Sequence, residues 1–331
     1  MWFQQLTGFE EHSPGQVRQH LSVEGPYLSS KVNGRRFQAG HLEIPTLSEL
    51  RRAAPDPASY QSNSRLSEIV ADVQDLHADP ANAHALFQAA SQFNLLEMLS
   101  PEVTPEAGID RYEHDHTQGP ACAIACGAGT IYRNYFVPVG DQIGQTTDRQ
   151  INCLDRLEKH LSHMGQPPWT MTNGYALITR DQLDRINQHL RSLDDPQREL
   201  LKGELRIGLQ WQTEVTLPGA GHLVSQAYCS ALPVAYTDVP AREWEPFARL
   251  ILEATYEATL QAALLNYERN GSEKVYLTLV GGGVFGNEMH WIIESLEKAL
   301  RLFACSPLDV QIVSYGQPNP WVQQLVRGLG D

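Results

Sequence analysis

The stretch KVYLTLVGGGVFGNEMHWIIESLEKALRLFACSPLDVQIVSY, residues 274–315, decides the fold. Its first apolar run, 274–280, predicts a buried strand, and 309–315 predicts a second one. Between them lie three adjacent glycines and then apolar residues at helical spacing over 288–303. A strand, a helix and a strand in this order form a βαβ unit with parallel strands and a right-handed crossover. The sequence therefore predicts an α/β fold with three layers, α/β/α.

The segments that precede this unit extend the predicted sheet and cover it. Residues 206–216 alternate apolar and polar, and a Pro-Gly turn joins them to a second apolar run, 222–236, so we expect a hairpin and a mixed sheet. Apolar residues run down one face of a long helix over 244–265. Further strands are predicted at 37–44, 83–90 and 175–179, and further helices at 47–53, 64–76, 121–136, 146–163 and 181–203.

The first 60 residues differ from the rest in composition. They are rich in turn formers and carry little periodic apolar sequence. We expect residues 1–60 to be an N-terminal extension that packs on a single catalytic domain, residues 61–331, because no linker interrupts the chain after residue 60.

Composition limits the classes of partner. The 331 residues contain 25 Lys plus Arg and 39 Asp plus Glu, a formal charge of −14, which argues against a nucleic-acid binder. A local anion site made of backbone N–H groups remains compatible with this charge. No apolar run approaches a membrane span, and the N-terminal stretch lacks the pattern of a secretory signal. Five scattered cysteines do not form a disulfide framework. We expect a cytoplasmic protein, or an exported effector that acts in a host cytosol.

The glycine loop is the first candidate site. Gly281, Gly282 and Gly283 follow a strand directly, and Val284, Phe285, Gly286 and Asn287 lead into the next helix. Glycines let the backbone turn sharply and present N–H groups, and the helix adds its positive end, so the loop suits a phosphate or diphosphate. It has neither the spacing of an ATP-binding P-loop nor a full dinucleotide fingerprint. The structural alternative is a plain tight connection.

The second candidate site joins the sequence FQAASQFN, residues 87–94, to an acidic loop, residues 100–119. Ser91, Gln92 and Asn94 lie where a predicted strand ends, which is where ligands bind in open α/β sheets. The loop carries Asp110, Glu113 and Asp115, and Gln118 and Gly119 precede a second predicted helix. The alternative is a solvated loop that caps the helix. His114 and His116 alternate and lack further ligands, so we expect no metal and no cofactor. No cysteine has the position of a nucleophile.

These motifs carry a resemblance to a known family. FQAASQFN resembles the first ligand loop of macrodomains, and LTLVGGGVFGN resembles their second, diphosphate-binding loop. YEHDHTQGPACAIA, GQTTDRQIN, MTNGYALIT and SQAYCSALPVAY are similar to a divergent, arginine-specific group of macrodomain ADP-ribosylhydrolases that a Legionella effector typifies. The resemblance covers most of residues 25–316. It departs from common macrodomains at Ser91, where they have asparagine, and in the acidic loop, where they have a glycine triplet.

The resemblance implies a macrodomain-like fold, an ADP-ribose pocket, and hydrolysis of the bond between ADP-ribose and a protein arginine. Carried over, the ligand-binding residues would be Ser91, Gln92, Phe93, Asn94, Gln118, Gly119 and the loop Gly281 to Asn287, with Phe285 on a ribose. Cleavage through an oxocarbenium-like state needs a carboxylate near the anomeric carbon, and we expect Asp115 to supply it, with Glu113 and Asp110 next. A non-catalytic ADP-ribose reader and another nucleotide-processing enzyme stay open as alternatives.

Overall fold

The computed structural model describes residues 1–162 and 166–330. Its centre is a seven-stranded sheet in the order β4-β11-β12-β6-β13-β14-β5. The strands β12, β6, β13, β14 and β5 are parallel, and β11 runs antiparallel to both of its neighbours. The strands, in sheet order, are β4 (His41–Glu43), β11 (Gly208–Glu214), β12 (Leu223–Cys229), β6 (Leu86–Ala90), β13 (Lys274–Leu277), β14 (Asp309–Ser314) and β5 (Arg65–Val70).

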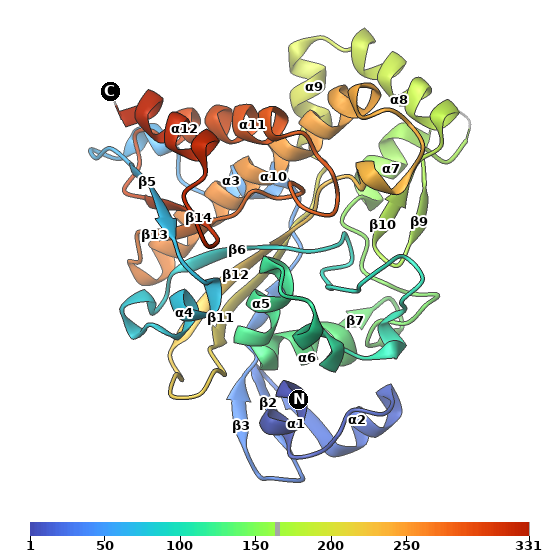
Figure 1. The fold of residues 1–331 in the computed structure, drawn as a ribbon, viewed down its shortest axis with the longest axis vertical. Helices are drawn as coiled ribbons and strands as arrows, with labels where there is room; N and C mark the ends of the chain where they lie inside the picture. The colour runs from blue at the N-terminus through green and yellow to red at the C-terminus, as the bar shows by residue number, and fades with distance from the viewer. Residues whose placement is uncertain (163–165, 331) are drawn as a thin grey trace.

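Helices cover both faces of this sheet, as the three-layer prediction requires (Figure 1). One face carries the long helix α10 together with α3, α8, α9, α11 and α12, and the other face carries α4, α5 and α6. The helices on the first face are α3 (Leu47–Ala53), α8 (Arg180–Ser192), α9 (Asp195–Lys202), α10 (Ala241–Asn270), α11 (Met289–Leu302) and α12 (Pro320–Gly330). Those on the second face are α4 (Val73–Ala78), α5 (Gln118–Ala125) and α6 (Gly127–Tyr135).

Smaller elements complete the fold. A three-stranded sheet with two short helices lies beside α6 at one end of the molecule, and two hairpins and α7 lie near α8 and the acidic loop (Figure 1). They are α1 (Trp2–Thr7), α2 (Pro14–His20), β1 (Leu21–Glu24), β2 (Tyr27–Ser30), β3 (Arg36–Gln38), β7 (Pro138–Val139), β8 (Gln142–Ile143), α7 (Asp155–Leu161), β9 (Thr170–Thr172) and β10 (Tyr175–Leu177). No helix within residues 1–162 or 166–330 combines the length and the apolar character that a membrane crossing needs.

The βαβ unit forms as predicted: β13 and β14 pair in parallel, and α11 connects them. The hairpin β11–β12 is also confirmed, and it makes the sheet mixed. The helix predicted at 47–53 has the same bounds as α3, which begins with a capping box at Thr46 and Glu49.

Several element predictions are wrong in their bounds or type. The strand predicted at 37–44 is two strands, β3 and β4, which belong to different sheets, and the one predicted at 222–236 ends at Cys229. Residues 64–76 form the edge strand β5 and then α4, since β5 pairs with β14 along its whole length. Residues 121–136 are two helices that separate at Cys126, which has a non-helical ψ of 57°. Residues 181–203 divide into α8 and α9, because Asp194 caps a new helix. Of residues 146–163, only Asp155–Leu161 is helical, and residue 163 lies outside the described residues.

The first 60 residues contribute to both parts of the molecule. Residues 2–38 contain the small sheet and the two short helices, while β4 is an edge strand of the main sheet and α3 packs against α10. The division of the chain at residue 60 stays a prediction.

Candidate active site

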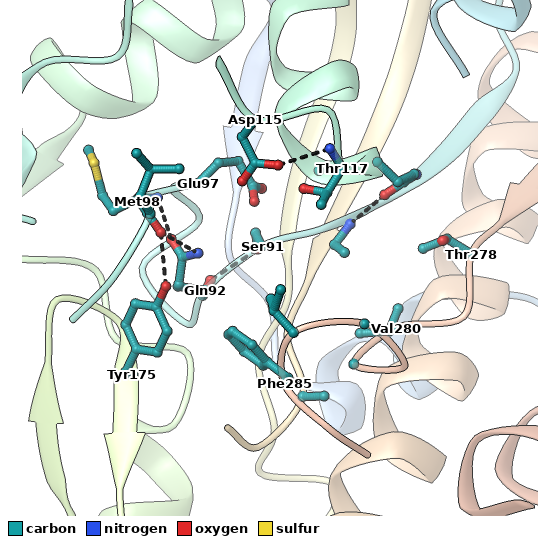
Figure 2. A pocket seen from close by; sticks show the side chains of 18 of the residues that line it. Ser91, Gln92, Glu97, Met98, Asp115, Thr117, Tyr175, Thr278, Val280 and Phe285 are labelled. Carbon is teal, nitrogen blue, oxygen red and sulfur yellow. Dashed lines mark hydrogen bonds between the residues drawn. The ribbon is translucent and has the colours of Figure 1, made fainter. Parts of the chain in front are cut away.

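A cavity of about 310 Å³ opens where β6 and β13 end, at the carboxyl edge of the parallel strands (Figure 2). This edge is where ligands bind in open α/β sheets. Four segments line it: the end of β6 and the loop after it, the start of α5, the aromatic residues near β10 and β12, and the glycine loop. The lining residues are Ala90, Ser91, Gln92, Glu97, Met98, Leu99, Asp115, Thr117, Gln118, Gly119, Tyr175, Ala231, Tyr236, Thr278, Leu279, Val280, Gly281, Gly283, Val284 and Phe285.

The glycine loop presents backbone amides to this cavity. Gly281 has φ +80°, and a Cβ there would lie 2.5 Å from the Cβ of Ala231, so the position requires glycine. Within the described chain, the amides of Gly283, Val284 and Phe285 donate to no acceptor. Three successive N–H groups without an acceptor in a tight loop are an arrangement that suits an anion.

The other residues of this loop hold its shape. The side-chain amide of Asn287 donates to the carbonyl of Leu232 at 2.9 Å, and its backbone N–H donates to Gly281 at 3.0 Å. Gly282 and Gly286 lie in the turn and, like Asn287, are absent from the cavity wall. Of the seven loop residues predicted to bind a ligand, four line the cavity and these three brace it.

The first predicted ligand loop divides in the same way. Ser91 and Gln92 line the cavity, but Phe93 is buried in the core and the Asn94 amide points away, donating to Gln150 at 2.8 Å. The chain turns sharply here, because the N–H of Gln92 bonds to the carbonyl of Leu96. The placement of Phe93 and Asn94 in the cavity is therefore corrected.

The same turn delivers a carboxyl group that the sequence motifs did not single out, Glu97. The Gln92 side chain bonds the backbone N–H and carbonyl of Met98 at 2.8 and 3.2 Å, which closes the loop. Glu97 is 6% exposed and its Oε1 has no hydrogen-bond partner within the described chain. Burial raises the pKa of the Glu97 carboxyl well above its ordinary value, with a smaller raise from Asp115, whereas Arg133 acts in the opposite direction.

Asp115 is the second carboxyl in the cavity, and it lies near Glu97 (Figure 2). Its side chain is partly exposed, and its Oδ1 accepts a hydrogen bond from the Thr117 N–H at 2.9 Å. The cavity thus combines a buried carboxyl that favours its protonated form with an accessible carboxylate.

Asp110 and Glu113, the other two acidic candidates, lie outside the cavity. Glu113 accepts the backbone N–H of Trp2 at 2.9 Å, and the Asp110 N–H donates to Glu11 at 2.7 Å. The short helix Asp110–His114 turns both residues toward the N-terminal segment. Of the three predicted carboxylates, the structure therefore brings only Asp115 to the cavity.

Gln118 and Gly119 line the wall at the start of α5, as predicted. The Gln118 side chain fastens α5 to β6, since its amide donates to Gln88 at 2.8 Å and its oxygen accepts from Ala90 at 3.0 Å. A Cβ at Gly119 would lie 2.5 Å from Glu97 Oε2. Glycine at this position therefore lets the first turn of α5 approach the buried carboxyl.

Three aromatic rings form the opposite wall. Phe285 lies with its centroid 5.4 Å from Tyr175 and 5.7 Å from Tyr236. The Tyr175 hydroxyl donates to the carbonyl of Met98 at 2.9 Å, so it also supports the loop that carries Glu97 (Figure 2). Only Phe285 was predicted: Tyr175 and Tyr236 lie in MTNGYALIT and SQAYCSALPVAY, two stretches from which no ligand-binding residue was assigned.

A second cavity, of about 510 Å³, adjoins the first. The two share Thr117, Gln118, Thr278 and Leu279, and the second contains Asp72 and the 76% exposed ring of Tyr315. Together they form one elongated site along the carboxyl edge of the sheet. Among residues 1–162 and 166–330, no three His, Cys, Asp or Glu side chains gather as a metal site would require.

Comparison with known proteins gives only distant likenesses. No protein-family model matches the chain, and no curated protein matches its sequence. Among solved structures, poly(ADP-ribose) glycohydrolase from Thermomonospora curvata, bound to the inhibitor ADP-HPD, is similar with a TM-score of 0.45 and 12% identity over 95% of this chain and 97% of that one. A mutant poly(ADP-ribose) glycohydrolase from Deinococcus radiodurans, in complex with ADP-ribose, gives 0.45 and 13% over 87% and 92%.

Proposed function

We propose that the chain is an ADP-ribosyl hydrolase that removes ADP-ribose from modified protein arginine. One observation carries the proposal: a single cavity combines three free backbone amides with two carboxyl groups in contrasting environments. The amides suit a diphosphate, and the carboxyl pair suits the cleavage of a glycosidic bond. The resemblance of both loops to macrodomain loops supports the same ligand.

The elongated site suits the order of groups in ADP-ribose. The diphosphate would lie on the amides of Gly283, Val284 and Phe285, and the distal ribose between Phe285 and the carboxyl pair. The adenosine would extend into the second cavity, where Tyr315 offers an exposed ring for stacking and Asp72 a carboxylate for the amino group of the base.

The carboxyl pair can divide the work of hydrolysis. Glu97, protonated because it is buried, would give its proton to the departing guanidine nitrogen as the C–N bond breaks. Asp115, ionised, would take a proton from the attacking water, whose hydroxyl forms the new bond to the anomeric carbon. Solvent then returns the proton from Asp115 to Glu97. The reaction releases ADP-ribose and leaves the arginine of the substrate protein unmodified. The two proton transfers together return the enzyme to its starting state.

The charge of the site favours arginine over a further ADP-ribose unit as the leaving group. None of the described residues that line the two cavities is a lysine or an arginine. These walls offer no cationic side chain to an anionic polymer, whereas a guanidinium beside Asp115 would pair with a carboxylate of opposite charge.

Release of ADP-ribose from an arginine-modified peptide, followed by mass spectrometry, tests the proposal. The wild-type chain should release ADP-ribose and unmodified peptide, and calorimetry should show binding of ADP-ribose but not of ATP. Binding without release would identify a reader instead. Tight binding of ATP or NAD without ADP-ribose binding would point to another nucleotide-processing enzyme.

A further inference from the structure

Arg133, on α6, is a buried cation that has no role in the proposed reaction as described above. Its side chain is 1% exposed, and its guanidinium lies 3.6 Å above the centre of the Tyr228 ring. No carboxylate in residues 1–162 or 166–330 forms an ion pair with it, and its Nη1 has no hydrogen-bond partner there. Burying a charge without a paired counter-charge is energetically costly, so other contacts must compensate for the lost hydration of Arg133.

The hydrogen bonds that Arg133 does make lead to the Glu97 loop. Its Nε donates to the carbonyl of Leu95 at 3.2 Å, and its Nη2 donates to Thr130 on its own helix at 2.9 Å. Leu95 has φ +65°, a left-handed backbone conformation that is strained for leucine. This strained residue is two positions before Glu97, and such strain collects at functional sites when the surroundings enforce it.

Arg133 also faces Glu97 electrostatically. The other groups that face this carboxyl are Asp115 from the acidic loop, Tyr112 from the short helix before it, Cys122 from α5, Tyr175 from β10 and Tyr228 from β12. Burial raises the pKa of Tyr112, Cys122, Tyr175 and Tyr228, so these groups stay neutral at ordinary pH. The charge near Glu97 is therefore set by Asp115 and Arg133, which oppose each other.

We propose that Arg133 is the positioning residue of Glu97: it holds the left-handed turn at Leu95 and supplies the buried positive charge that faces the carboxylate when Glu97 has given up its proton. Without that cation, the carboxylate left behind in the cavity would face only the negative charge of Asp115. The kinetic part of this inference rests on the function proposed above.

Two substitutions separate the structural role of Arg133, holding the turn at Leu95, from its electrostatic role near Glu97. Arg133→Gln removes the charge but keeps an amide that can donate to Leu95. Arg133→Lys keeps a charge but loses the planar guanidinium group with its several N–H donors. Glu97 acts in its protonated form, so kcat/KM falls as the pH rises through its pKa. In Arg133→Gln that falling limb should move at least about one pH unit higher, because loss of a nearby cation disfavours the ionised carboxyl. In Arg133→Lys it should stay near the wild-type position while kcat drops about tenfold from the loosened turn.

Lys202→Gln is the matched control, since Lys202 is also a 1% exposed cation but belongs to an ion cluster with Glu199 and Glu257. It should lower Tm and leave the pH profile in place. If the pH profiles of kcat/KM for wild type and Arg133→Gln coincide, the inference is overturned. Should Arg133→Gln not fold, wild-type kcat in Arg133→Lys would overturn it, and the tenfold loss would support it.

A readout without turnover keeps this inference separate from the proposed reaction. The Glu97 carboxyl can be titrated by NMR in chains labelled with 13C-glutamate, its signal assigned by its loss in Glu97→Gln. A higher midpoint in Arg133→Gln than in wild type supports the role of Arg133 even if no chain hydrolyses ADP-ribosyl-arginine. An unchanged midpoint refutes it even if the wild type is an efficient hydrolase.

Discussion

At the residue scale, the two carboxyl groups of the cavity owe their difference to their surroundings. Glu97 is enclosed by α5, α6 and the loop that carries it, whereas Asp115 is partly exposed and bonded to a backbone N–H. A buried carboxyl beside an accessible one is an arrangement suited to acid and base roles. The assignment of the acid to Glu97 and the base to Asp115 follows from this contrast.

Replacing either carboxyl should remove catalysis and spare binding. We expect Glu97→Gln and Asp115→Asn each to slow the release of ADP-ribose from an arginine-modified peptide by at least about a hundredfold, the usual contribution of a positioned acid or base. Calorimetry should show ADP-ribose affinity close to wild type, since the amides of the glycine loop are untouched. Glu113→Gln is the matched control, because Glu113 lies outside the cavity. Wild-type rates in both cavity variants would disprove the assignment.

The raised pKa of Glu97 also makes a prediction about stability. The folded chain holds this proton more tightly than the unfolded chain does. The contribution of Glu97 to the free energy of unfolding is therefore most favourable at low pH. It is lost as the pH rises from the unfolded pKa, about 4.3, through the folded pKa. Glu97→Gln cannot lose a proton there. Its Tm relative to wild type should therefore increase from pH 5 to pH 8. A Tm difference that is constant over this range would show that Glu97 is not perturbed.

At the element scale, the glycine loop depends on its backbone more than on its side chains. Gly281→Ala places a Cβ against Ala231 at a residue with φ +80°, so we expect ADP-ribose affinity to fall at least about tenfold. Gly219→Ala has a similar φ, +81°, with open space around the new Cβ, in a turn away from the cavity. Calorimetry of both folded variants should show loss of binding in the first alone. Equal affinities would mean that the loop does not hold the ligand.

Gly282→Val tests the same loop from the other side. A Cβ at Gly282 would lie 3.1 Å from Ile292 and 3.3 Å from the carbonyl of Leu279, so valine must push the loop away from α11. The displacement should weaken ADP-ribose binding while the chain stays folded, which calorimetry and circular dichroism measure together. A folded variant with wild-type affinity would contradict the placement of the diphosphate.

The N-terminal segment clamps the acidic loop. Glu11 accepts the N–H groups of Ile109 and Asp110 at 2.8 and 2.7 Å, and the Tyr135 hydroxyl at 2.6 Å. We expect Glu11→Ala to free this loop, to speed amide exchange at Ile109 and Asp110, and to lower kcat at least about tenfold through misplacement of Asp115. Glu10→Ala is the neighbouring control, as Glu10 is exposed. Unchanged exchange at both amides would rule the clamp out.

Elements and residues that depend on local interactions could be predicted from the sequence, whereas those that depend on contacts between distant residues could not. The βαβ unit and α3 were predictable because local periodicity, a glycine turn and a capping box specify them. The spacing of apolar residues predicts a helix where β5 lies, because its six residues gain their structure from pairing with residues of β14 that lie 244 positions later. The sequence does not single out Glu97, because the turn that places it in the cavity depends on contacts of Gln92, Leu95 and the distant Arg133.

At the scale of the whole molecule, a large cluster of positive charges lies away from the site. Lys202, Arg51 and Lys298 pair with Glu199, Glu253 and Glu257, joining α3, α9, α10 and α11 on the face opposite α5. The chain as a whole is acidic, and the described walls of the two cavities carry neither lysine nor arginine. Recognition of a phosphate would thus depend on oriented amides, which act at short range, instead of on a long-range positive potential.

This charge distribution predicts which substrate the chain prefers. Binding through amides alone should change little when NaCl rises from about 50 to 300 mM, since few cations of the protein are screened. Repulsion from the acidic surface should keep poly(ADP-ribose) chains from binding more tightly than monomeric ADP-ribose, and hydrolysis of an arginine-linked monomer should be faster than release of units from the polymer. Competition calorimetry at both salt concentrations and parallel mass-spectrometric assays measure these differences. Tight, salt-sensitive binding of the polymer together with its faster hydrolysis would reverse the preference and identify the polymer as the substrate.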